Sequence, residues 1–310
     1  MANERYGNNY LTCLGKEASY GTEQTTYEVI LPDKVEMKKT IASIDISQKT
    51  GTLEKKNTEM HAGYTGGTVA ISGELKTGAD ANTHHGILLE AMFNDSASVF
   101  NIPAVGTTPN SYTIYQYFND DAGHKAVGCV LESLEIAGSS GGAITYTANF
   151  RAKTITYETD LSALTDPFSS VPAITPALFA NTTVQLIGDD TNISKINSFT
   201  LSLTNSFADE ANMYQNSNTK LLEILTGFAG SLSVEWNYDK TNNSDVEAKL
   251  MTTASDAITI TDGTNSWILS TFGKYTEYQF SDPDKGIFTS RLSKTLMSDA
   301  SNDAVAITIT

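Results

Sequence analysis

Residues 65–75 read TGGTVAISGEL and residues 226–236 read TGFAGSLSVEW, with Thr, Gly, Ser and Glu at matching places 161 residues apart. Apolar and polar side chains alternate in both stretches, as in a strand with one buried face. The apolar set must face a core, so the other set faces away from it. The apolar set is Val69, Ile71, Leu75, Leu232, Val234 and Trp236; the other set is Thr68, Ser72, Glu74, Ser231, Ser233 and Glu235.

Two further pairs of stretches support a repeat. Residues 143–147 match residues 304–308 at the same spacing, and residues 112–117 match residues 275–280 with a displacement of two. A period this long indicates a duplicated domain, because solenoid and propeller units repeat every ~20 to 50 residues. We therefore predict a mainly β protein with two tandem, duplicated β-sandwich or partial-barrel domains. The first domain is expected over residues 1–160 with an N-terminal arm, a proline-containing linker over 161–178, and the second domain over 179–310.

Short runs rich in Thr, Val, Ile and Tyr give the expected strands. They are residues 41–47, 68–75, 130–136, 143–156, 183–187, 198–203, 231–236 and 305–310. Each domain is also expected to carry one flanking α-helix, over residues 83–93 and 244–251, where apolar spacing or a Ser N-cap favours a helix. Between strands lie two long polar segments, residues 48–64 and 204–225, which are either functional arms or disordered surface loops.

The chain is acidic, with a net charge of −16. Up to residue 160 it holds 12 basic and 19 acidic residues, and after it 8 and 17. This balance argues against a surface that grips DNA, since such surfaces rely on Lys and Arg at phosphates. The two cysteines, Cys13 and Cys129, form no disulfide or metal pattern, which predicts a reducing compartment. The N-terminus lacks signal-peptide features, and no apolar stretch reaches ~20 residues, so no membrane insertion is expected.

Catalytic signatures do not occur in the sequence. It has no phosphate-binding loop, no GxSxG elbow, no HExxH helix and no EF-hand pattern. The adjacent His84 and His85 point in different directions on a helix and lack a third ligand, so a pair at the helix surface is expected rather than a metal site. We expect no enzymatic activity and no cofactor.

Three segments carry a family resemblance. Residues 15–22, GKEASYGT, resemble the opening of tail tube proteins of long-tailed bacteriophages, with a "KE-x-x-YGT" pattern. Residues 64–75 resemble that family's "GG-x-V-x-G-x-L" strand before a helix. Residues 130–136, the glycine-rich hairpin 137–142 and residues 143–150 follow the family's order as well. The resemblance covers nearly the whole chain, in the duplicated-domain form found in siphophages.

The resemblance implies a structural role in the virion, with assembly in the host cytoplasm. Six β domains of such proteins join their inner sheets into a ring, and stacked rings form a tube for double-stranded DNA, which passes without specific binding. Two domains in one chain imply a ring of three chains with pseudo-sixfold symmetry. Further implied partners are a tape measure protein, a tail terminator and a distal tail protein. An acidic channel would repel DNA phosphates.

The resemblance also assigns roles to residues. If the repeated strand belongs to the inner sheet, the channel is lined by Thr68, Ser72, Glu74, Ser231, Ser233 and Glu235. The long polar segments would connect neighbouring rings through Thr52, Glu54, Lys55, Lys56, Glu59, Asp209, Glu210 and Tyr214.

Two other classes remain open from the sequence. A different virion or surface β protein, such as a decoration protein, a baseplate component or an adhesin, would use a duplicated β domain equally well. A carbohydrate-active enzyme or lectin would need a pocket with converging carboxylates or aromatic rings.

Overall fold

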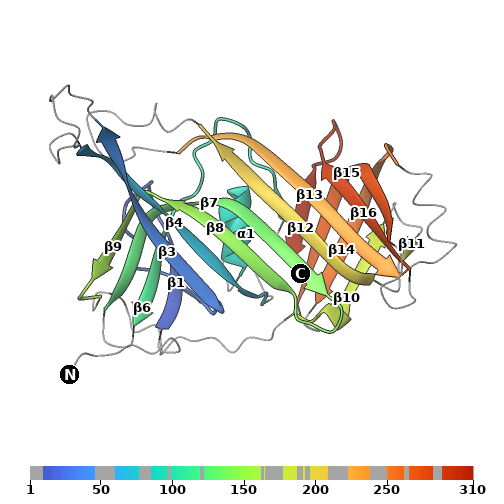
Figure 1. The fold of residues 1–310 in the computed structure, drawn as a ribbon, viewed down its shortest axis with the longest axis horizontal. Coiled ribbons are helices and arrows are strands. Elements are labelled where there is room, and N and C mark those ends of the chain that lie inside the picture. The colour runs from blue at the N-terminus through green and yellow to red at the C-terminus, as the bar shows by residue number, and fades with distance from the viewer. Residues whose placement is uncertain are drawn as a thin grey trace, which may run out of the picture.

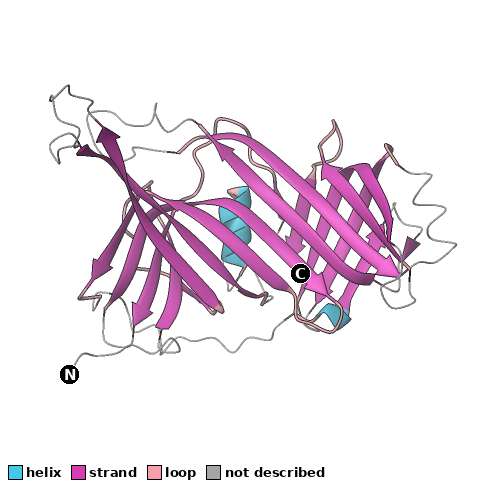
Figure 2. Cartoon of the chain, viewed as in Figure 1, coloured by secondary structure: helices cyan, strands magenta, loops and turns pink. Residues whose placement is uncertain are grey.

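The computed structural model describes residues 10–45, 60–76, 85–95, 99–118, 122–161, 164, 177–186, 191–192, 196–208, 223–237, 250–261, 265–281 and 288–309. These residues form a mainly β structure, as predicted, and the strands pair antiparallel. Within the described ranges, one α-helix, α1 (Gly86–Phe93), and a short 3-10 helix (Phe179–Asn181) accompany the strands (Figure 2).

One continuous sheet of eight antiparallel strands runs through both halves of the chain (Figure 1). In hydrogen-bonding order the strands are β3 (Lys34–Asp45), β4 (Met60–Glu74), β8 (Thr145–Ala152), β7 (Gly123–Ser139), β12 (Ile196–Phe207), β13 (Leu225–Asn237), β16 (Thr289–Leu296) and β15 (Ser266–Ser281). The β7–β12 pair joins the halves, with register from Ser139 opposite Ser198 to Ser133 opposite Thr204. We call this pair the internal junction.

The remaining strands attach to the first parts of β7 and β15. On the first half, β9 (Thr154–Glu158) and β6 (Tyr112–Phe118) flank β7, followed by β1 (Tyr10–Lys16) and β2 (Glu28–Ile30). On the second half, β17 (Val305–Ile309) and β14 (Thr253–Thr261) flank β15, followed by β10 (Thr182–Leu186) and β11 (Thr191–Asn192). β5 (Val99–Asn101) pairs with β17.

Both long strands, β7 and β15, change partners along their length, and each has a bulge near the change. The register shifts between Leu131 and Ser133 in β7 and between Tyr275 and Glu277 in β15. A bulge bends a strand and increases its twist. Each long strand can therefore leave the eight-stranded sheet and continue in a second group of strands.

The core is shared by the two halves. One cluster of buried apolar residues includes side chains from β4 and β7 as well as from β12, β13 and β15. Helix α1, all of whose residues are buried, packs beneath the internal junction, and the Phe93 ring lies 6.2 Å from those of Phe100 and Phe228. The Asn205 amide donates to the carbonyl oxygens of Met92 (3.1 Å) and Leu131 (3.2 Å). These contacts fix the helix to both halves.

The sequence matches have mixed outcomes. Residues 65–74 and 226–236 lie on β4 and β13, each of which is the second strand of its half of the sheet. The other two matches do not join equivalent strands. Tyr146 lies on β8 between β4 and β7, whereas Ile307 lies on β17 between β15 and β5. Residues 112–117 form β6 beside β1, whereas residues 275–280 pair with β16. Apolar alternation is common to all strands, so a match of five or six residues does not specify a strand's place.

The expected elements are mostly present with different bounds. The first helix is α1, within the predicted range, while residues 244–249 of the second expected helix lie outside the described residues. β3 begins seven residues before the expected strand at 41, and residues 143–156 form two strands separated at Lys153. Most of the expected linker, residues 161–178, also lies outside the described part, so the domain bounds stay a prediction.

Both cysteines are free and fully buried. Burial raises the pKa of Cys13 to about 12 and the pKa of Cys129 well above its ordinary value. Because the thiolate is the reactive form, the folded protein at about pH 8 is expected to react negligibly with a thiol-titrating disulfide reagent. The denatured chain should release two equivalents. Rapid labelling of the folded protein would contradict this burial.

Candidate assembly surface

Rows of directly opposite residues cross the eight-stranded sheet without interruption. Opposite residues in antiparallel strands share a face of the sheet, so each row reports one face. One row contains Lys34, Ser72, Thr147, Glu135, Ser202, Ser231, Thr295 and Lys274. It passes through the internal junction at Glu135 and Ser202. We call the surface that holds this row the polar face, because the apolar core lies on the other side of the sheet.

All six residues predicted to line a channel lie on the polar face. Thr68 and Ser231 are exposed, and the four others are partly buried. They alternate along β4 and β13 with the fully buried Val69, Ile71, Leu232, Val234 and Trp236. The predicted separation of the two residue sets is confirmed; the role of the polar set is considered below.

Outside the bulge of β7, where Glu132 lies, the charges on the polar face are balanced among the described residues of the eight strands. Its acidic residues are Glu36, Glu74, Glu135, Glu235 and Glu277, and its basic residues are Lys34, Lys38, Arg151, Lys274 and Arg291. Several of these charges are paired: the ammonium nitrogen of Lys34 lies 3.2 Å from a carboxylate oxygen of Glu36, and Arg291 is directly opposite Glu235. The ammonium nitrogen of Lys76, just beyond β4, lies 2.7 Å from a carboxylate oxygen of Glu74. Serine and threonine fill most other positions. The chain's acidic excess is therefore not concentrated on this face.

The sheet is open at both ends. Among the described residues, β3 pairs with β4 alone, and residues 277–281 of β15 pair with β16 alone. Unpaired strand edges present backbone N–H and C=O groups that can accept another strand. Apolar side chains gather at these edges: Ile41 is 55% exposed on β3 and Phe280 is 49% exposed on β15. The Phe280 ring stacks on Phe288, itself 42% exposed, at a centroid distance of 5.1 Å.

The residues proposed to connect rings cannot be placed. Thr52, Glu54, Lys55, Lys56, Glu59, Asp209, Glu210 and Tyr214 all lie outside the described residues. The preceding strand β12 continues to Phe207, so the second polar segment begins later than the sequence suggested.

The KExxYGT segment forms a structural hub, a role that the sequence did not reveal. The buried Glu17 carboxylate accepts hydrogen bonds from the backbone N–H groups of Gly21 (2.7 Å) and Gly128 (2.8 Å). It also accepts from the hydroxyls of Ser111 (2.7 Å) and Thr113 (2.9 Å). Gly21 and Gly128 have φ values of +75° and +67°, which glycine adopts most easily. Glu17 therefore connects the turn after β1 to β6 and β7.

The neighbouring Lys16 makes a second connection. Its ammonium group pairs with the buried carboxylate of Glu90 on α1. Tyr20 lies in the turn after β1, and the ammonium of Lys153, between β8 and β9, lies 5.2 Å from the centre of its ring. The segment thus joins the N-terminal strand to the helix and to the β7–β9 region, which explains why these residue types occur together.

A buried ion pair occupies the second half of the core. The Lys294 ammonium, 1% exposed, donates to Asp256 Oδ2 (2.8 Å) and to the carbonyl oxygens of Ala254 (2.7 Å) and Thr271 (2.9 Å). Tyr275 donates to the other Asp256 oxygen at 2.5 Å. Burial lowers the pKa of Lys294, and Asp256 opposes that shift. All three ammonium protons have acceptors, so this is a structural ion pair.

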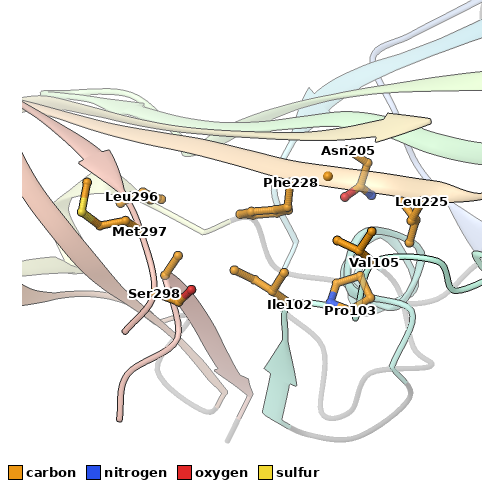
Figure 3. Close-up of a pocket in the computed structure, with 11 residues that line it drawn as sticks. Ile102, Pro103, Val105, Asn205, Leu225, Phe228, Leu296, Met297 and Ser298 are labelled. Atoms are coloured by element: carbon orange, nitrogen blue, oxygen red, sulfur yellow. The ribbon is translucent and has the colours of Figure 1, made fainter. Parts of the chain in front are cut away.

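A cavity of about 400 Å³ lies where the two halves meet. Figure 3 shows Phe228, Leu225 and Asn205 on one side of it and Ile102 and Pro103 on the other. Its described lining residues include no ionisable side chain; they are Ile102, Pro103, Val105, Asn205, Leu225, Gly227, Phe228, Leu296, Met297, Ser298 and Ala304.

Metal-ligating residues do not gather into a group of three or more in the part of the chain that the structure describes. His85, expected at the helix surface, is instead 1% exposed, with its ring 4.4 Å from Tyr146 and its Nδ1 atom accepting from the Lys76 N–H (2.8 Å). The expectation of a surface pair was wrong for His85, because the residue precedes a helix that is buried on all sides. Among the described helices, none has the length and apolar character to span a membrane.

The described strands thus form an antiparallel open sheet with one apolar and one polar face. The family model described as "Phage tail tube protein" matches residues 7–287, and the chain belongs to this family. It is thus a structural component of a bacteriophage tail. No curated protein matches the chain.

Proposed function

We propose that the chain is the repeating subunit of a tail tube, in which three copies close into a ring and rings stack. The observation that carries this proposal is the continuous eight-stranded sheet, polar on one face and open at both ends. Joined end to end, three such sheets give a closed barrel of 24 strands, which leaves no unpaired edge. We further propose that the two halves are copies of one domain, so that the ring has pseudo-sixfold symmetry.

The expected size of the barrel suits a channel. Strands about 4.8 Å apart and tilted by about 40° give 24 strands a wall diameter of about 48 Å. Side chains would narrow the bore by roughly 10 Å, leaving enough room for a DNA duplex. One copy closed on itself would be filled by its own side chains, since eight-stranded barrels lack a water-filled channel.

The polar face is proposed to line this channel, with Thr68, Ser72, Glu74, Ser231, Ser233 and Glu235 from the two quasi-equivalent strands. The face is rich in hydroxyl groups and balanced in charge, so it has no net positive potential to retain phosphates. The described residues support a neutral lining rather than the strongly acidic one that net charge alone suggested.

Changing both glutamates to lysine should make the channel retain DNA. The Glu74→Lys, Glu235→Lys variant removes two negative charges and adds two positive charges per chain. It should therefore assemble and then hold a short duplex that wild-type tubes release. Tube-bound duplex, measured by co-sedimentation, should fall steeply as salt is raised from about 50 to 200 mM. The matched control is Glu28→Lys, Glu158→Lys, on strands β2 and β9 outside the eight-stranded sheet. Equal DNA retention by both variants would contradict the assignment of the polar face.

The two long polar segments are proposed to connect successive rings. Deleting residues 52–59 should leave a folded subunit that forms rings but stacks poorly, because only contacts along the tube axis are removed. Size-exclusion chromatography and electron microscopy would show single rings in place of tubes. Normal tube formation by the deletion variant would contradict this role.

Other tail components are proposed as partners at the ends and inside the tube: a tape measure protein, a tail terminator and a distal tail protein. Assembly is proposed to take place in the host cytoplasm. These proposals rest on family membership.

Electron microscopy of the purified protein tests the proposed function. Tubes or rings of uniform diameter are expected, and native mass spectrometry of single rings should give three chains. A protein that stays monomeric at every concentration, or that binds as separate copies to another surface, would favour the alternative of a decoration or baseplate protein.

A further inference from the structure

We infer that the free edge of β3 in one copy pairs antiparallel with residues 277–281 of β15 in the next copy, with Lys34 directly opposite Gln279. This inference rests on the proposed function and specifies its subunit interface. The internal junction is the template, because it already joins one half of the sheet to the other inside each chain.

The β3 side of the interface corresponds to β12 at the internal junction. Ser72 of β4 lies opposite Lys34 of β3, and Ser233 of β13 lies opposite Thr200 of β12. Ser72 and Ser233 occupy the same place in the repeated stretch. Lys34 is therefore the counterpart of Thr200.

The β15 side corresponds to β7. Glu74 lies opposite Thr145 of β8, and Thr145 lies opposite Ala137 of β7. Glu235 lies opposite Arg291 of β16, and Arg291 lies opposite Gln279 of β15. Since Glu74 and Glu235 are also matched in the repeat, Gln279 is the counterpart of Ala137.

The internal junction places Thr200 directly opposite Ala137. The same relation between copies places Lys34 opposite Gln279. The free side of β15 is also the correct side: β14 flanks the first part of β15 as β6 flanks β7, and β12 continues along β7 on the side of β6. The corresponding place beside residues 277–281 holds no strand among the described residues.

Burial on the core side agrees with this pairing. At the internal junction Leu201 and Ile136 are opposite each other and 0% and 1% exposed. Their counterparts at the free edges, Val35 and Tyr278, are only partly buried. Pairing between copies would bury them and remove apolar surface from water.

The large side chain lies on opposite sides of the two interfaces: on β12 at the internal junction, and on β15, the counterpart of β7, at the inferred interface. At the internal junction Phe199 lies opposite Gly138, where a Cβ atom would come within 2.7 Å of the Phe199 ring. The inferred register places the large Phe280 of β15 opposite the smaller Asp33 of the next copy. Each interface thus combines one aromatic ring with one smaller residue, and the half-exposed Phe280 gains a cover.

Charge alone would favour a different register. The inferred pairing puts Glu36 opposite Glu277, whereas a slip of two residues would put Lys34 opposite Glu277. Each cross-strand charge pair contributes only ~0.2 to 1 kcal/mol, and less on a solvated face. The correspondence with the internal junction, where Thr200 lies directly opposite Ala137, therefore decides the register.

A pair of cysteines tests the register in assembled tubes. Directly opposite residues have Cα atoms ~4.5 to 5.5 Å apart, within disulfide range, while diagonal neighbours at ~7 to 8 Å are outside it. Lys34→Cys, Gln279→Cys tubes should oxidise to covalent dimers and trimers and no larger species. Lys34→Cys, Glu277→Cys tubes should form at least tenfold less. Thr200→Cys, Ala137→Cys is the matched intrachain control, and the native thiols are buried.

The outcomes separate the inference from the proposed function. Efficient cross-linking of the Lys34–Glu277 pair, or none in either pair while tubes form, overturns the register and leaves the tube intact. If the cysteine variants fail to assemble, wild-type tubes made from mixed ¹⁴N and ¹⁵N chains can be treated with a short lysine cross-linker. Isotopically mixed Lys38–Lys274 links support the pairing, and their absence contradicts it. Wild-type protein that forms no rings would overturn the proposed function itself.

Discussion

The Phe280→Asp variant is expected to remain a folded subunit and to lose ring formation. The Phe280 side chain is 49% exposed in the single chain, so its exchange should change folding stability by less than about 1 kcal/mol. In the ring, aspartate removes apolar burial and faces Asp33 of the next copy. A loss of about 2 kcal/mol per interface is about 30-fold, and three interfaces make it about 10⁴-fold per ring.

Analytical ultracentrifugation across a range of concentrations measures this effect. Val105→Asp is the control, since Val105 is 74% exposed and lines the cavity between the two halves. The control should form rings at wild-type concentrations. Ring formation by Phe280→Asp at those concentrations, with an unchanged circular dichroism spectrum, would contradict the interface.

The Glu17→Ala variant is expected to produce the largest loss of folding stability. The substitution leaves two buried backbone N–H groups and two hydroxyls without the carboxylate that accepts from them. Each unsatisfied buried donor costs ~1 to 3 kcal/mol, reduced where a hydroxyl turns or water enters. A total of about 4 kcal/mol is a large part of the ~5 to 15 kcal/mol of a typical domain.

Thermal unfolding should therefore begin about 5 to 10 °C lower than in wild type. Glu158→Ala provides the control, because that carboxylate makes a partly exposed ion pair with Lys125 (3.1 Å) and should cost less than about 1 kcal/mol. Glu17→Gln keeps the shape but turns one acceptor into a donor, so an intermediate loss is expected. Equal melting temperatures for Glu17→Ala and Glu158→Ala would show that the hub does not stabilise the fold.

The sequence predicted the faces of the central strands well. Alternation in residues 65–75 and 226–236 correctly separated buried Ile71 and Val234 from exposed Thr68 and Ser231. A period of two residues is a local property that the pleat converts directly into two faces. The same rule led to the polar face, with all six candidate residues on it.

The alternation rule could not predict which strands pair with each other. Two of three sequence matches joined strands at different places, because Ile307 and Tyr146 share alternation but not neighbours. The Glu17 hub combines residues 111 positions apart in sequence, from Glu17 to Gly128, and only the fold brings them together. The shared core was not predicted either, since Asn205 was expected in the polar segment 204–225, yet its amide connects both halves.

A cryo-electron microscopy map of wild-type tubes tests the central claim most directly. The proposal predicts three chains per ring, 24 strands continuous around the bore, and the side chains of Ser72 and Ser233 pointing into the channel. Strand β3 of each copy should lie beside β15 of the next. Six full-length chains around one channel, or a wall whose polar face points away from the bore, would contradict it.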